Sequence, residues 1–291
     1  MSWRVVVISS RCKLDYKMEH LVIRTVDDEK RIYLGDISVL MIETTAVSLT
    51  AYLVSELVRN KIKTIFCDNL HNPLAEVMPF YGSYDTSGKL RQQIRWGEAI
   101  KANVWREIVR AKIINQSNVL GLIGRTERSK QVRSFADQIE PGDPTNREGH
   151  AAKVYFNSLF DDDFFRNSDD PRNAVLNYGY TIILSCFNRE VAASGYLTQL
   201  GIWHNNSNNS FNLSSDLMES FRPIIDLFAY KSGFKILEKD EKLAIVNLLN
   251  SKVKIANSEQ FINNAIGIYA RCIFSAIEEN DLSLIENWSY L

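Results

Sequence analysis

Short apolar runs separated by polar turns dominate the N-terminal part of the chain. The runs are rich in Val, Ile and Leu and cover residues 3–8, 21–26, 31–34, 37–43 and 62–67. Runs of this length and spacing are typical of strands in a small, mainly antiparallel sheet or sandwich. Ser48 can cap a helix whose apolar positions recur at helical spacing to about Arg59. We therefore predict a β domain with one helix, in which residues 16–20 connect two sheet segments.

From about Leu90 to the end of the chain, apolar residues recur at the spacing of helices. One long helix is predicted around residues 94–114, and a second over residues 174–200. Between the two patterns, residues 68–88 are rich in Asn, Pro, Gly and Ser, which form turns. The predicted fold class is α+β. It consists of an N-terminal, mainly β domain over residues 1–80, a linker over 81–89 and a larger all-α domain over 90–291.

Composition and charge limit the classes of function. The 291 residues suffice for one large domain or two smaller ones, and 45% hydrophobic with 24% charged residues is ordinary for a globular protein. The formal net charge of −1 excludes a global basic field, so nucleic acid would have to bind through local clusters of Lys and Arg. One candidate is the polar face of the long helix, and another is Arg125, Arg128, Lys130 and Arg133. Such clusters usually form a solvated helix face, and in an enzyme that acts on nucleic acid they could contact phosphates.

The cysteines and the apolar segments bear on the cellular compartment. The four cysteines are far apart in the sequence and form no C-x-x-C pair: Cys12, Cys67, Cys186 and Cys272. We expect reduced thiols, without a zinc site or a disulfide framework. No apolar segment reaches the length of a membrane span. We therefore expect a cytoplasmic protein that does not associate with membranes.

A glutamate heads the apolar face of one predicted helix. Asp143 is a residue that caps helices, and Pro144 is suited to the first helical position. At helical spacing from Glu148, one face carries Ala151, Ala152, Tyr155, Phe156 and Leu159. A carboxylate on such a face is costly unless a cation meets it. A structural ion pair and a metal site are both compatible with this pattern.

Three further residues indicate a functional site only when they are taken together. His204 lies at a predicted helix end beside an Asn/Ser loop, where a lone histidine is usually structural. Asp216 and Glu219 share one helix face, where they are also compatible with carboxylates at a helix N-terminus. If Glu148 converges with them, carboxylates and an imidazole would form a site for Mg²⁺ or Mn²⁺. A divalent ion with open positions is suited to phosphodiester chemistry.

Several motifs along the chain resemble one family. They are N-R-E-G-H-A-A-K-V-Y-F, L-N-Y-G-Y-T, the single His204 and D-L-M-E-S-F-R-P, together with W-R-V-V-V and I-F-C-D-N nearer the N-terminus. These motifs, in this order, resemble those of the first CRISPR-associated protein, in a short member like those of type II systems. The resemblance implies that Glu148, His204 and Glu219 are metal ligands and catalytic residues, and that Asp216 is an additional acidic residue near the site. It also implies the fold described above.

The resemblance further implies an activity and partners. The family comprises metal-dependent DNA endonucleases and integrases, which join the 3′-hydroxyl ends of a prespacer to the CRISPR repeat by transesterification, with Mg²⁺ or Mn²⁺ as cofactor. Its members are homodimers that assemble with the second CRISPR-associated protein on double-stranded DNA. The effector nuclease of the system is a further candidate partner. Arg147, Tyr180 and Arg222 lie within or beside the motifs as candidate DNA contacts, as does Asn146.

One residue of the motifs differs from the family pattern. Two functions other than a DNA endonuclease and integrase also stay open. Ser220 stands where many similar sequences have proline, which we expect to alter only the local helix start. A non-catalytic DNA-binding scaffold of the same fold would keep the basic helix faces and lose a metal ligand. A metal hydrolase of small phosphoesters would act without DNA and without steep salt dependence, unlike an enzyme that binds DNA.

Overall fold

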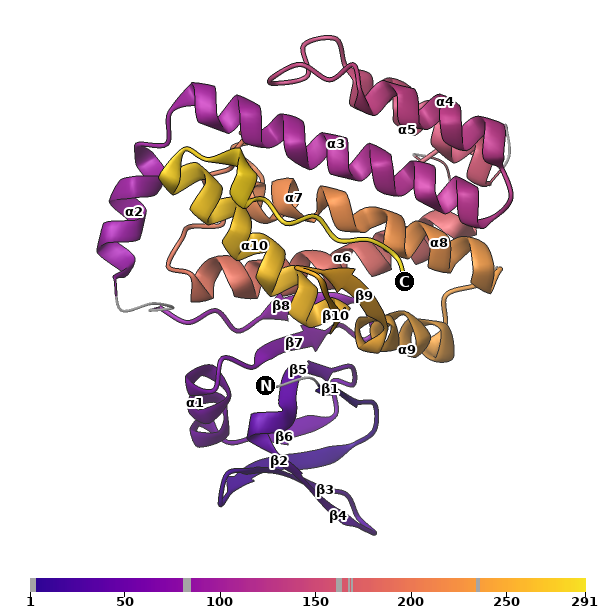
Figure 1. Cartoon of the computed structure of the whole chain (residues 1–291). Helices are drawn as coiled ribbons and strands as arrows, with labels where there is room; N and C mark the ends of the chain where they lie inside the picture. The colour runs from indigo at the N-terminus through magenta and orange to yellow at the C-terminus, as the bar shows by residue number, and fades with distance from the viewer. Residues whose placement is uncertain (1–3, 81–84, 161–163, 167, 169, 234–235) are drawn as a thin grey trace.

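The computed structural model describes residues 4–80, 85–160, 164–166, 168, 170–233 and 236–291. A β-rich N-terminal part lies below a larger helical part in Figure 1. The elements of the N-terminal part are β1 (Arg4–Ile8), β2 (Cys12–Lys17), β3 (His20–Arg24), β4 (Glu29–Tyr33), β5 (Ile37–Ile42), β6 (Val47–Leu49), α1 (Ala51–Arg59), β7 (Lys63–Cys67) and β8 (Pro73–Glu76). The predicted strands are thus present. Trp3, predicted in the first strand, lies outside the described residues.

The strands form two four-stranded sheets, with the orders β1-β5-β7-β8 and β4-β3-β2-β6. In the first sheet, β1, β5 and β7 are parallel and β8 is antiparallel. In the second, β4, β3 and β2 are antiparallel and β6 pairs parallel with β2. The prediction of a mainly antiparallel sheet is therefore wrong for the first sheet. Residues 16 and 17, predicted in a connection, belong to strand β2.

The strand β5 joins two hydrophobic cores, which explains its sequence. Val39 and Met41 belong to the core of the helical part, whereas Leu40 and Ile42 belong to the core formed with α1 and the second sheet. Because both faces are covered, every residue of β5 is buried. A strand buried on both faces has a continuous apolar run, which is common in parallel sheets. The β-rich part therefore shares a hydrophobic core with the helices above it.

Local signals place some helix boundaries differently from the sequence prediction. Helix α1 is capped by Thr50, whose Oγ1 accepts a hydrogen bond from the N–H of Leu53 at 3.2 Å, and Ser48 instead lies in β6. The predicted long helix is divided into α2 (Thr86–Ile94) and α3 (Glu98–Leu122), because Gly97 adopts an extended conformation between them. Helix α2 begins inside the predicted linker, and residues 81–84 of that linker lie outside the described residues. The division at residues 80 and 90 stays a prediction.

The helical part contains a small β-hairpin as well as helices. Its helices are α2, α3, α4 (Thr126–Ala136), α5 (Arg147–Leu159), α6 (Pro171–Ala193), α7 (Asn212–Met218), α8 (Arg222–Ser232), α9 (Lys239–Asn247) and α10 (Ile262–Glu279). Strands β9 (Lys252–Ile255) and β10 (Ser258–Phe261) pair antiparallel, with Ala256 and Asn257 at positive φ in the turn. The hairpin corrects the prediction of an all-α domain, whereas the predicted α+β class is confirmed.

Helix α3 runs the length of the helical part and positions the site (Figure 1). It contacts α5, α8 and the short 3₁₀ helix Glu219–Phe221. Residues from distant parts of the sequence therefore meet along α3. Cys12, Cys67, Cys186 and Cys272 are free cysteines in the structure. Within the described ranges, no helix has the length and apolarity needed to cross a membrane.

Candidate active site

Glu148 lies in the first turn of α5, whose start is fixed by two side chains. Asn146 is the N-cap, and its Oδ1 accepts the N–H of Gly149 at 3.2 Å. The carboxylate of Asp143 accepts the N–H groups of Arg147 at 2.8 Å and Glu148 at 2.9 Å. The prediction that Asp143 is the cap and Pro144 the first helical residue is therefore wrong by one turn. Asp143 nevertheless stabilises the same helix end, because its carboxylate accepts hydrogen bonds from N–H groups that have no partner within the helix.

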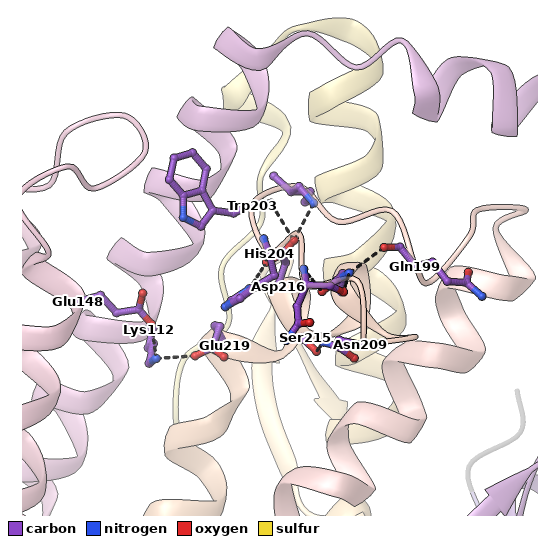
Figure 2. A network of polar contacts seen from close by, with 12 residues as sticks. Lys112, Glu148, Gln199, Trp203, His204, Asn209, Ser215, Asp216 and Glu219 are labelled. Atoms are coloured by element: carbon purple, nitrogen blue, oxygen red, sulfur yellow. Dashed lines mark hydrogen bonds and ion pairs between the residues drawn. The ribbon is translucent and has the colours of Figure 1, made fainter.

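Lys112 lies between Glu148 and Glu219 (Figure 2). Its Nζ donates to Glu148 Oε1 at 2.6 Å and also to Glu219 Oε2. The Lys112 side chain is 11% exposed and that of Glu219 is 6% exposed. Burial alone would lower the pKa of Lys112, but the two carboxylates outweigh burial and raise it. Lys112 is therefore a charged ammonium shared by two carboxylates.

Glu219 is held by the short 3₁₀ helix and by a second cation. The carbonyl of the next residue, Ser220, accepts Asn115 Nδ2 and Trp288 Nε1, both at 3.1 Å. Arg222 donates its Nε to Glu219 Oε1 at 2.7 Å. Burial would raise the pKa of Glu219, but Arg222 and Lys112 lower it to about 2. Glu219 is consequently ionised at any physiological pH.

Asp216 is fully buried and fastens the turn that carries His204. Its carboxylate accepts the backbone N–H groups of Ile202 at 2.6 Å, Trp203 at 2.9 Å and His204 at 3.1 Å. Its Oδ1 also lies 2.5 Å from Nδ1 of His204. Figure 2 shows the two side chains facing each other. An ionised carboxylate only accepts, so Nδ1 carries the hydrogen and Nε2 of the neutral imidazole keeps its lone pair. Asp216 therefore holds the ring and the backbone of His204 in place, and its assignment as an additional acidic residue of the site stays a prediction.

The structure brings Glu148 and Glu219 into contact with the same lysine and places His204 near them. Glu148 and Glu219 share one cation, and both raise the pKa of His204, after the larger effect of its hydrogen bond to Asp216. His204 therefore lies within electrostatic reach of the two glutamates. Among the described residues, however, no three His, Cys, Asp or Glu side chains are gathered closely enough to hold one metal ion. The metal-ligand assignments of Glu148, His204 and Glu219 stay predictions.

The three candidate DNA contacts have different surroundings. Arg147 is partly exposed at the start of α5 and forms no ion pair within the part of the chain that the structure describes. Arg222 is engaged with Glu219, and its guanidinium lies over the Tyr180 ring, 4.5 Å from the centroid. Tyr180 is buried, and its hydroxyl donates to Asp226. The geometry thus gives Tyr180 a supporting position behind Arg222, whereas the buried Nε of Arg147 has no hydrogen-bond partner in the described structure.

Two charged residues near the site were not predicted from the sequence. Lys112 was not singled out as a functional residue, and Asp226 was not considered. Lys112 was one of several cations on the polar face of a predicted helix, where most are solvated. Asp226 is fully buried in α8 and accepts the hydroxyls of Tyr180 and of Tyr155, the latter at 3.0 Å. Its one signal in the sequence is its place among the apolar residues of P-I-I-D-L-F-A.

The raised pKa of Asp226 should make the free energy of unfolding depend on pH. Burial raises its pKa to about 6, although the hydrogen bonds from Tyr180 and Tyr155 and the charge of Arg222 act in the opposite direction. A folded-state pKa above the unfolded value gives stability that is present below the unfolded pKa and is lost as pH rises through about 6. Between pH 4 and 7 we expect the free energy of unfolding of the wild type to fall, relative to Asp226→Asn, by about 2 to 3 kcal/mol. Urea denaturation of both proteins at several pH values measures this, and parallel pH profiles would contradict it.

Comparison with solved structures identifies the class of fold. The chain superposes on a casposase bound to integration product with a TM-score of 0.78, 18% identity and coverage of 98% of this chain and 93% of the other. A Cas1 protein from Thermotoga maritima gives a TM-score of 0.73 at 16% identity, with 94% and 97% coverage. The Cas6-RT-Cas1–Cas2 complex gives 0.74 at 18% identity, covering 99% of this chain and 36% of that longer one. These likenesses define a Cas1-type fold.

The sequence comparisons identify the family. The family described as CRISPR associated protein Cas1 matches residues 5–233. The chain is 35% identical, over 228 residues, to a protein named CRISPR-associated endonuclease Cas1 from Neisseria meningitidis serogroup C, covering 78% of this chain and 75% of the relative. A protein named CRISPR-associated endonuclease Cas1 1 from Francisella tularensis subsp. novicida is 25% identical over 269 residues, with 84% and 83% coverage. The chain belongs to the Cas1 family.

Proposed function

We propose that the protein is a metal-dependent DNA endonuclease and integrase of CRISPR adaptation. It joins the 3′-hydroxyl ends of prespacer DNA to the CRISPR repeat by transesterification and hydrolyses phosphodiesters with water as nucleophile. The observation that carries the proposal is the pairing of Glu148 and Glu219 around one cation, beside a histidine whose Nδ1 is bound to Asp216. Family membership and the names of the relatives, which include endonucleases, support it.

The donor atoms of Glu148, Glu219 and His204 are of the types that suit Mg²⁺ or Mn²⁺. Two carboxylates already balance a positive charge, and carboxylate oxygens with one imidazole nitrogen suit these ions, Mn²⁺ tolerating the nitrogen better. The bond from His204 Nδ1 to Asp216 leaves Nε2 directed elsewhere, which is the usual arrangement of a ligating histidine. When bound, the ion would polarise the phosphoryl oxygen and stabilise charge on the attacking and leaving oxygens. Glu148, His204 and Glu219 would hold it, and Asp216 would orient His204.

The proposed partners follow from the same family. One similar structure is a complex whose name contains Cas1 and Cas2, and another is a casposase with its integration product. We infer that this chain works as a homodimer with Cas2 on double-stranded prespacer and repeat DNA in the cytoplasm. The effector nuclease of the system is a further candidate partner. Because the net charge is −1, contact with DNA must come from local basic side chains or from the assembled complex.

Strand joining in vitro tests the proposed function. The protein and Cas2 are incubated with a labelled duplex that ends in 3′-hydroxyl groups and with a supercoiled plasmid carrying the repeat. Joining is expected with Mn²⁺ or Mg²⁺ and is expected to stop when a chelator is added. A complex that assembles with Cas2 and DNA but joins no strands with either metal would favour the non-catalytic scaffold. Hydrolysis of small phosphoesters without DNA, insensitive to salt, would favour the metal hydrolase.

Arg147 provides a test of DNA binding that is separate from catalysis. Arg147 is partly exposed at the start of α5, it is not paired with a carboxylate in the described ranges, and its buried Nε has no hydrogen-bond partner there, so a DNA phosphate is a suitable partner. We expect Arg147→Ala to weaken binding of all DNA sequences alike and to reduce the slope of log K against log salt by about one. Arg59→Ala is the control, because Arg59 is 70% exposed on α1 and paired with Glu56. Equal salt slopes for Arg147→Ala and wild type would remove Arg147 from the DNA interface.

A further inference from the structure

Lys112 bridges carboxylates that come from separate segments of the chain. It projects from the middle of α3, while Glu148 lies in the first turn of α5 and Glu219 begins the 3₁₀ helix before α8. The ammonium contacts one oxygen of each glutamate, and the other oxygen of Glu219 is bonded to Arg222. Figure 2 shows the lysine between the two acidic side chains. Two carboxylates so close would repel each other without a positive charge between them.

The chain contains a second buried lysine that serves for comparison. Lys63 of β7 is 1% exposed and pairs with a single glutamate, Glu76 of β8, which also accepts Asn188 Nδ2 from α6 at 3.1 Å. This pair fastens the first sheet to the helical part. Lys112 differs because it occupies the space between two proposed metal ligands. An ammonium and a divalent ion cannot bind the same two oxygens from the same position.

We propose that Lys112 is an internal counter-ion that holds Glu148 and Glu219 together until a divalent cation displaces it, so that Lys112 sets the metal affinity of the site. The inference rests on the proposed function, because it requires that these glutamates bind a metal. It assigns Lys112 a positioning role. Before metal binds, Lys112 keeps the two carboxylates facing each other. When metal binds, the ion takes over their charge and the ammonium leaves the pair.

Replacing Lys112 with methionine removes the competitor while keeping much of the side-chain volume. With a chelator present, Lys112→Met is expected to unfold at a lower temperature than wild type, because two neighbouring carboxylates have lost a shared partner. Titration calorimetry with MnCl₂ is expected to give a dissociation constant at least about tenfold lower than wild type, a change of about 1.4 kcal/mol. Lys63→Met is the matched control: it should also destabilise the protein, but its Mn²⁺ affinity should equal that of wild type.

The wild-type protein supplies an independent measurement. A displaced Lys112 amine becomes accessible, so its acetylation by an N-hydroxysuccinimide ester, followed by mass spectrometry, should rise several-fold on addition of Mn²⁺. Lys63 should stay unreactive under both conditions, because its ion pair lies outside the site. This measurement does not depend on the folding of any variant.

The outcomes separate the two proposals. Mn²⁺ that binds wild type tightly, with Lys112 acetylation unchanged and no gain of affinity in Lys112→Met, would overturn the role of Lys112 and leave the proposed function standing. A wild-type protein that binds no Mn²⁺ in the presence of Cas2 and DNA would overturn the metal site itself and the inference with it. If Lys112→Met does not fold even with Mn²⁺, the acetylation of wild type decides.

Discussion

Glu148→Gln is expected to abolish metal-dependent strand joining while the protein stays folded. Glutamine has the shape of glutamate but lacks the charge, so the centre loses one of the two carboxylates that balance a cation. Loss of several kcal/mol of transition-state charge stabilisation corresponds to a decrease in rate of about a thousandfold or more. Glu148 is 26% exposed, and Lys112 keeps Glu219 as its partner. The cost in stability should therefore be about 1 kcal/mol, the size expected for a partly exposed ion pair.

The rate and the stability are measured separately. Strand joining is followed with the labelled duplex and plasmid at saturating Mn²⁺, and stability is measured by urea denaturation. Glu127→Gln is the matched control, because Glu127 is 85% exposed on α4 and pairs only with the exposed Lys130 in the described structure. It should join strands at the wild-type rate. Joining by Glu148→Gln within a few-fold of wild type would remove Glu148 from the mechanism.

The sequence predicted the elements better than their arrangement. The apolar runs that became β1, β5 and β7 were recognisable, but a continuous apolar run does not reveal whether its neighbours are parallel. Ser48 and Thr50 are equally good caps in the sequence, and only the pairing of β6 with β2 selects Thr50. The helical periodicity runs through Gly97, so the break between α2 and α3 left no signal in the apolar pattern.

The sequence predicted which residues belong to the site, but it did not predict which groups they contact. Glu148 was recognisable because a carboxylate heads an apolar helix face, which requires a cation nearby. The cation in the structure is Lys112, which the sequence placed on the polar face of the predicted long helix, with solvation and nucleic-acid binding as the two interpretations. Its burial arises from the packing of α3 against α5 and the 3₁₀ helix, so it depends on contacts between distant segments. For the same reason Asp216 could be placed near the site but not assigned its hydrogen bonds to residues 202–204.

The centre combines carboxylates of different function. Glu148 and Glu219 face a cation, Asp216 faces backbone N–H groups and an imidazole, and Asp226 faces tyrosine hydroxyls. Arg222 links two of these environments, because it bonds to Glu219 and lies over the ring of Tyr180. The position of Glu219 therefore depends on α3 through Lys112 and on α8 through Arg222. Substitutions around it should be strongly non-additive.

Asp216→Asn is expected to destabilise the protein and to weaken metal binding together. Asp216 is fully buried, and each carboxylate oxygen accepts two hydrogen bonds, Oδ2 from Ile202 and Trp203 and Oδ1 from the backbone and ring of His204. The amide group of asparagine replaces one of these oxygens with a donor, which leaves two N–H groups without an acceptor. At about 1 to 3 kcal/mol for each unsatisfied buried group, the expected loss is about 2 to 6 kcal/mol. An imidazole no longer held at Nδ1 should also weaken Mn²⁺ binding by about 10- to 100-fold.

His204→Ala separates the two effects of Asp216. The His204 side chain is 46% exposed, so its removal should change the free energy of unfolding little, whereas the loss of Nε2 should abolish strand joining. Asp216→Asn should instead lower the unfolding free energy in urea and keep residual joining at high Mn²⁺ concentration. If Asp216→Asn were as stable as wild type, its carboxylate would not be what holds the turn of residues 201–204. If His204→Ala joined strands normally, orientation of the imidazole would have no part in the reaction, and the buried Asp216 would serve the fold alone.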